Sequence, residues 1–127
     1  MDLNRNGPYN WKVLDPPGGT YYAGPRAQSE PETRALVAAV RRICPDVTVW
    51  IHQHARLVDT SKGNRAVIRR YAHAVGLPAI NYGTRSGSLP TWQHHAFPRT
   101  TPFVVEFPAG ALSQAKVRAH VRAIGAL

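Results

Sequence analysis

The stretch DVTVWIHQH, residues 46–54, is the part of the sequence that decides the fold class. Val47, Val49 and Ile51 occupy every second position, and the alternate positions include the large apolar residue Trp50. Alternation with a period of two is typical of a β-strand. We therefore predict a strand here that is apolar on both of its faces.

Helical and extended patterns alternate on either side of this strand. Ser29 to Glu32 fit a capping box and predict a helix that begins at Ser29 and stops before Pro45. The other predicted elements are a helix over about 64–75, a short strand AINY at 79–82, a strand PFVVEF at 102–107 and a final helix capped by Ser113. This alternation predicts an α/β fold with parallel strands, helical cover and functional residues at strand ends.

Two stretches are predicted to be loops. Residues 14–28 are rich in Pro and Gly, and residues 83–100, GTRSGSLPTWQHHAFPRT, separate the strand patterns at 79–82 and 102–107. Long ordered loops are usually functional, so both stretches are candidate parts of a site.

Composition limits the classes of protein to which the chain can belong. Its 127 residues suit one domain or a piece of one, and its net charge of +9 comes from cations scattered over predicted helix surfaces. We therefore expect no nucleic-acid partner.

No apolar run is long enough to span a membrane, and no export leader is recognisable, which leaves the compartment open. The single Cys44 excludes an internal disulfide, and we expect its side chain to be buried.

Polar residues stand at the ends of the predicted strands. His52 and His54 close one strand, Tyr82 closes another, and Glu106 lies between apolar neighbours in the third. A histidine at a strand end is commonly a hydrogen-bonded structural residue, and a Tyr before Gly commonly packs. A carboxylate among apolar residues is costly unless it has a partner or a task, so for Glu106 a structural and a functional role are both open.

Five motifs follow one another in a specific order. They are DLNRN (2–6), GPRAQSEPET (24–33), IHQHA (51–55), YGTRSGSLPTW (82–92) and VVEFPAG (104–110). Together they resemble the C-terminal half of zinc metallocarboxypeptidases of the carboxypeptidase A type, with the bacterial branch that acts on cell-wall peptides closest in character. The resemblance implies a mixed, mostly parallel sheet covered by helices on both faces.

The resemblance implies a set of substrate-binding residues. Asn4 and Arg5 match the family's Asn-Arg pair that binds the terminal carboxylate of the substrate, and a guanidinium suits a carboxylate because it offers two parallel hydrogen bonds. Tyr82 matches the tyrosine that caps the site, and Ser88 matches the serine that follows this tyrosine six residues later in a Gly-Ser turn. Arg85 would line the specificity pocket, along with Ser86, Gly87 and Leu89.

The resemblance also implies catalytic roles. His52 matches the third zinc ligand, and Glu106 matches the general base that takes a proton from the attacking water. The family's other two ligands come from an H-x-x-E motif before DLNRN, and none of the six histidines of this chain stands in such a motif. Substitute ligands could be imagined among His54, Asp59, His94 and His95.

Residues 1–127 are therefore expected to be a partial carboxypeptidase-like domain that lacks the half bearing the H-x-x-E motif. Cutting a sheet in this way would leave a strand edge able to self-associate. The implied function is zinc-dependent hydrolysis of a C-terminal peptide bond or a cell-wall peptide amide bond, with a carboxylate-bearing peptide as substrate. The alternatives are an inactive remnant that binds such peptides and a basic module that binds a polyanion, which a steep loss of affinity with salt would reveal. Members of the family are often exported.

Overall fold

The computed structural model describes all 127 residues, and they form two compact units. Unit 1 comprises Met1–Asp46 and Thr84–Pro98, and unit 2 comprises Val47–Gly83 and Arg99–Leu127. The chain therefore leaves unit 1, forms most of unit 2, returns to unit 1 for a short segment and ends in unit 2.

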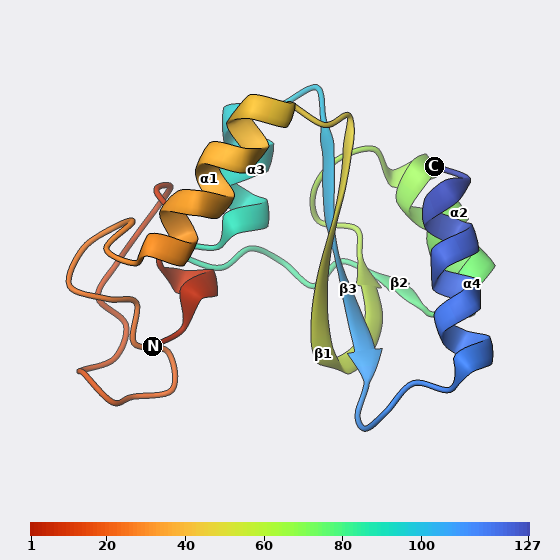
Figure 1. Cartoon of the computed structure of the whole chain (residues 1–127), viewed down its shortest axis with the longest axis horizontal. Helices are drawn as coiled ribbons and strands as arrows, with labels where there is room; N and C mark the ends of the chain where they lie inside the picture. The colour runs from red at the N-terminus through yellow and green to blue at the C-terminus, as the bar shows by residue number, and fades with distance from the viewer. The chain divides into compact units, whose positions relative to one another are not determined.

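Unit 2 is a three-stranded sheet with two helices. Its elements are β1 (Val47–Asp59), α2 (Arg65–Val75), β2 (Ala79–Ile80), β3 (Thr101–Pro108) and α4 (Gln114–Gly125). The strand order is β2-β1-β3, and β1 pairs in parallel with both neighbours. Figure 1 shows α2 and α4 side by side next to this sheet. The predicted α/β class with parallel strands is confirmed.

β1 is longer and less regular than the sequence predicts. Val47 to His54 follow β3 in register from Thr101 to Pro108, after which the register shifts repeatedly up to Val58. Beyond these shifts, the partners on β3 run backwards along the sequence: Leu57 lies opposite Glu106, and Val58 lies opposite Val105. His52 and His54 therefore lie within a strand that continues to Asp59, and neither residue ends it.

The core of unit 2 forms where α2 and α4 meet the sheet. Ile68 and Tyr71 of α2 pack with Phe103 of β3 and with Ala123 of α4, and each side chain is at most 5% exposed. Asn64 caps α2 by accepting hydrogen bonds from the second and third N–H groups of the helix, as expected for an asparagine N-cap. Gly76 caps the other end of α2, so the predicted start and end of this helix are confirmed.

Unit 1 contains the short 3₁₀ helix η1 (Leu3–Arg5) and the helices α1 (Pro31–Ile43) and α3 (Leu89–Ala96). Its loop is fixed by Asn6, which is fully buried. The Asn6 amide donates to the carbonyls of Ala23 and Arg26 at 2.7 and 3.0 Å, and its oxygen accepts from the Glu30 N–H at 3.2 Å. One side chain thus ties the start of the chain to the segment that enters α1.

Three local predictions in unit 1 are wrong. The capping box at Ser29 does not form, because its hydroxyl bonds to Asn6 and to the Glu30 carboxylate while Pro31 begins the helix. The predicted loop after residue 83 contains α3, which Ser88 caps by accepting from the Thr91 N–H. Cys44 is exposed, and it adopts the left-handed conformation just after α1. No helix in the chain has the length and apolar character needed to cross a membrane.

Candidate functional site

His52 and Glu106 occupy facing positions in unit 2. They are direct register partners on β1 and β3, so both project from the same face of the sheet. Both side chains are half-buried, and the Glu106 carboxylate accepts a hydrogen bond of 3.4 Å from the Ala55 N–H. Glu106 is therefore less buried than its apolar neighbours suggest, and the irregular part of β1 supplies its partner.

A buried ion pair fixes the segment that carries Tyr82. The Lys62 ammonium lies 3.0 Å from the Asp59 carboxylate, and both side chains are less than 5% exposed. Asp59 also accepts from the Tyr82 N–H at 2.9 Å, while Lys62 donates to the Gly83 carbonyl at 3.1 Å. The Tyr82 side chain itself is exposed. This pair was not predicted from the sequence, in which the D-x-x-K spacing directly after a strand is the only signal that indicates it.

The same bonds set the protonation state of Asp59. Burial raises the pKa of its carboxyl, but hydrogen bonds from the Ser61 hydroxyl, from Lys62 and from the Tyr82 N–H outweigh that effect. The pKa of Asp59 consequently lies below its ordinary value of 3.8. Asp59 is an ionised structural residue whose oxygens are already bonded.

The histidines and acids of this chain do not fit a catalytic zinc ion by themselves. Such an ion takes three protein ligands and one open position, and no cluster of three histidine, cysteine or acidic side chains is positioned to hold a metal. Of the residues considered as substitutes, Asp59 bonds to Lys62, and His95 stacks on the ring of Tyr9 with a centroid distance of 3.9 Å. His52 remains a candidate for a single ligand.

Unit 1 contains an open pocket of about 510 Å³. The residues that line it are Arg5, Leu14, Asp15, Tyr21, Thr84, Arg85 and Ser86. Three of them, Arg5, Arg85 and Ser86, are residues that the resemblance assigns to substrate binding. The pocket is amphipathic, because Leu14 and Tyr21 lie beside two guanidinium groups and one carboxylate.

Contacts on several sides hold Arg5 in this pocket. Its guanidinium lies 3.7 Å from the Asp2 carboxylate and 5.4 Å from the centre of the Tyr21 ring, and it donates to the Asn4 carbonyl at 2.8 Å. A cation over an aromatic face is attracted by the ring's electrons. The opening segment of the sequence therefore positions a cation.

Asn4 and Ser88 have structural partners in unit 1. Asn4 accepts a hydrogen bond of 3.2 Å from the Leu89 N–H, and Ser88 is the buried cap of α3. These contacts connect the segment that carries Arg5 to the start of α3. Neither residue lines the pocket.

Two glycines allow the Arg5 and Arg85 segments to meet. The Gly7 N–H donates to the Gly87 carbonyl at 2.7 Å, and a Cβ on Gly7 would lie only 2.6 Å from that oxygen. Gly87 has a φ of +65°, and a Cβ there would overlap the Arg5 carbonyl. This close approach requires glycine at both positions and places Arg85 and Ser86 beside Arg5.

No family model and no curated protein sequence matches the chain. Its structure is similar to that of murein-tripeptide amidase MpaA from Escherichia coli O157, with a TM-score of 0.73 and 25% identity over 99% of this chain and 56% of the amidase. It is also similar to carboxypeptidase A from Helicoverpa armigera, with a TM-score of 0.69 and 19% identity over 98% of this chain and 42% of that enzyme. The chain thus spans about half the length of these enzymes. The resemblance to the zinc metallocarboxypeptidases is confirmed, since the chain has their α/β fold.

Proposed function

We propose that this chain is the substrate-binding and base-bearing part of a peptide hydrolase of the metallocarboxypeptidase kind. The substrate is a peptide or cell-wall peptide with a free carboxylate. The observation that carries the proposal is that Arg5 and Arg85, which are 80 positions apart in the sequence, line a single pocket with Ser86. The resemblance assigned all three residues to substrate binding on sequence motifs alone.

The chemistry of the pocket supports a carboxylate ligand with a side chain attached. The Arg5 guanidinium can form paired hydrogen bonds with a carboxylate, and its contacts with Asp2 and Tyr21 restrict its orientation before the ligand arrives. Leu14 and Tyr21 offer apolar surface to the residue next to that carboxylate. Asp15 opposes anion binding, so the pocket favours one carboxylate over a densely charged polyanion.

The catalytic part of the proposal concerns Glu106 and His52. Glu106 would accept the proton of the attacking water as the oxygen adds to the peptide carbonyl, a role for which a half-buried carboxylate is suited because water can reach it. His52, its register partner, would be the chain's single ligand to the zinc ion of the family. Zinc would polarise the carbonyl and acidify the water in the complete site.

We further propose that residues 1–127 are a partial domain. The chain covers 56% of the amidase and 42% of the carboxypeptidase, and it does not itself provide a metal site. A protein that joins this chain to a segment with the H-x-x-E motif would provide the remaining ligands.

A binding experiment tests the carboxylate pocket on the chain itself. N-acetyl-alanyl-alanine is titrated in parallel with its C-terminal amide, and the amide signals of unit 1 are followed by NMR. The free acid should bind at least about tenfold more tightly than the amide, since a hydrogen bond to a charged group contributes roughly 1.5–3 kcal/mol.

Arg5→Ala and Arg85→Ala should each weaken binding of the acid, while Arg26→Ala serves as the matched control. The Arg26 side chain is exposed and does not line the pocket. Equal affinity for acid and amide, or equal weakening in all three variants, would contradict the proposal.

A further inference from the structure

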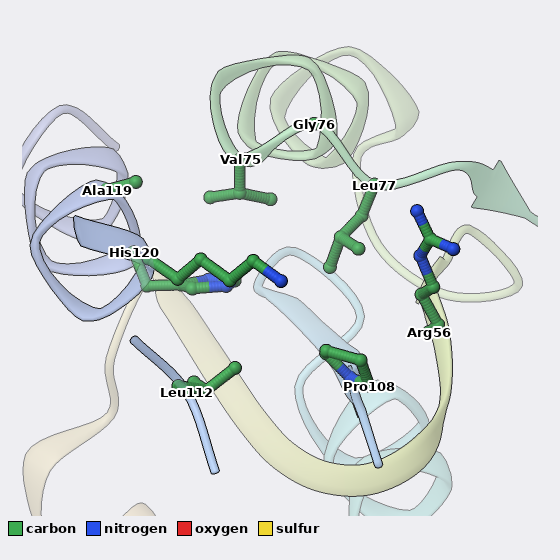
Figure 2. A pocket seen from close by; sticks show the side chains of 9 residues that line it. Arg56, Val75, Gly76, Leu77, Pro108, Leu112, Ala119 and His120 are labelled. Carbon is green, nitrogen blue, oxygen red and sulfur yellow. The ribbon is translucent and has the colours of Figure 1, made fainter. Parts of the chain in front are cut away.

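Unit 2 contains a small pocket that the proposed function does not use. It has a volume of about 90 Å³ and lies between the end of α2, the first half of α4 and the irregular end of the β1 and β3 pair. A water molecule needs roughly 10–15 Å³ of such space, so this pocket has room for several waters or one small ligand. Figure 2 shows Arg56 and His120 on opposite sides of it, with Val75 and Leu77 above and Pro108 and Leu112 below.

Positive charge surrounds this pocket without an acidic partner. Arg56 and Lys116 both line it, and neither side chain forms an ion pair or hydrogen bond within the chain. None of the lining residues is acidic. Two unpaired cations at one small cavity form a local positive field, which attracts an anion.

His120 adds a hydrogen-bond donor to the lining of the pocket. The side chain is 8% exposed, and its Nδ1 lies 2.8 Å from the Tyr71 hydroxyl. Burial raises the pKa of Tyr71 to about 12 and lowers the pKa of His120, so both groups are neutral near pH 7. The buried Tyr71 hydroxyl needs a hydrogen-bond acceptor, and Nδ1 of His120 accepts only when it carries no proton. The proton of the neutral imidazole therefore lies on Nε2.

The backbone at Arg56 has an uncommon conformation. Its φ is +55°, in the left-handed region that residues other than glycine seldom adopt, and it lies where the register between β1 and β3 shifts. Irregularities of this kind redirect side chains at functional sites. Here the irregularity brings the Arg56 side chain to the pocket that α2 and α4 also line.

From this arrangement we propose that the pocket lined by Arg56, Lys116 and His120 binds a small carboxylate anion with a short apolar tail. The carboxylate would accept from the two cations and from the imidazole N–H, and the tail would contact Val75, Leu77 and Leu112. Inorganic phosphate presents the same kind of oxygen acceptors, but it would leave these apolar side chains against a polar ligand. The volume admits a small monocarboxylate and excludes a folded partner.

The experiment is a titration of the chain with sodium propionate, followed by the ring nitrogens of the histidines in ¹⁵N NMR. Propionamide is the matched ligand because it has the same size without the charge, and inorganic phosphate and chloride are added at equal ionic strength. Propionate should shift the Nε2 signal of His120 and leave that of exposed His73 unchanged. Propionamide and chloride should shift neither signal, and phosphate should bind more weakly than propionate.

Arg56→Gln and Lys116→Gln should each weaken propionate binding about threefold to tenfold, since both cations keep contact with water and their interactions are partly screened. Arg69→Gln, which removes an exposed cation from α2 outside the pocket, should have no effect. All three substituted residues are on the surface, so the fold is expected to survive, and circular dichroism checks this. Equal shifts with propionamide, tighter binding of phosphate, equal weakening by Arg69→Gln, or no shift of His120 up to about 100 mM propionate would overturn the proposal.

Discussion

His52 of β1 lies directly opposite Glu106 of β3 in the parallel register of unit 2. Parallel strands are brought together by long connections, here through α2, β2 and a return through unit 1. Residues in direct register project from the same face, so this pairing gives one sheet surface both an imidazole and a carboxylate. The proposed assignment of base and metal ligand depends on this relationship.

The first prediction concerns Glu106 in a protein that joins this chain to an H-x-x-E segment. Glu106→Gln keeps the shape of the side chain and removes its basicity, so kcat should fall by about 10²-fold or more while KM changes little. Steady-state hydrolysis of a dipeptide with a free carboxylate measures both constants. Glu32→Gln, an exposed substitution on α1, is the control, and full turnover by Glu106→Gln would refute the assignment of the base.

The second prediction concerns the carboxylate within the proposed substrate pocket. Asp15 lines that pocket with Arg5 and Arg85, and it accepts a hydrogen bond from the Tyr21 N–H at 2.8 Å. Asp15→Asn keeps an oxygen acceptor and removes the negative charge, so the chain should bind N-acetyl-alanyl-alanine several-fold more tightly, by about 1 kcal/mol or less in a solvated pocket. The affinity for the C-terminal amide of the same peptide should not change. Weaker binding of the acid would mean that Asp15 itself contacts the ligand favourably.

Much of the fold could be predicted because local patterns agree with the tertiary structure. Asn64, Gly76 and the apolar series between them define α2, and Ser113 marks the start of α4. The errors arose where a tertiary contact competes with a local signal. Ser29 matches a capping box, but Asn6, far away in sequence, binds its hydroxyl. No local pattern contains that information.

The residues of the candidate site were proposed from sequence motifs, whereas their contacts could not be predicted. Arg5 and Arg85 were identified by resemblance, and they line one pocket. The Tyr21 ring over Arg5 could not be predicted, because it comes from a Pro- and Gly-rich loop whose path depends on tertiary hydrogen bonds. The Asp59 and Lys62 pair was missed for a related reason: a short spacing of opposite charges usually lies on the surface.

The third prediction is that breaking the buried ion pair of unit 2 is costly. Lys62→Met leaves the Asp59 carboxylate buried without its cation, which should lower the free energy of unfolding by about 3–5 kcal/mol. Urea unfolding measures the change, with Arg69→Met on the exposed face of α2 as the control. The double variant Asp59→Asn/Lys62→Met should recover part of the loss, because it leaves no unpaired charge. If the double variant lost as much stability as Lys62→Met and Asp59→Asn lose when measured singly and added, the two side chains would not interact.

The fourth prediction is the pH dependence that follows from Asp59. Its pKa is lower in the folded chain than its ordinary value of 3.8, so the unfolded chain binds the proton more readily. The resulting stability is therefore present above about pH 4 and is lost as the pH falls through the folded-state pKa. Urea unfolding between pH 6 and pH 3 should show a steeper acid loss for the unsubstituted chain than for Asp59→Asn. Identical slopes would assign the acid sensitivity to other carboxylates.

The fifth prediction separates two reasons for a glycine in unit 1. Gly87 and Gly18 both have positive φ, at +65° and +89°, but a Cβ at Gly87 would overlap the Arg5 carbonyl, whereas nothing lies within 4 Å of one at Gly18. Gly18→Ala should therefore cost only the left-handed strain of about 1–2 kcal/mol, with peptide binding preserved. Gly87→Ala should cost more, because it forces the Arg5 and Arg85 segments apart, and it should weaken binding of N-acetyl-alanyl-alanine. Urea unfolding and the NMR titration measure both variants. If Gly87→Ala matched Gly18→Ala in stability and in affinity, the close approach of these segments would not be what forms the pocket.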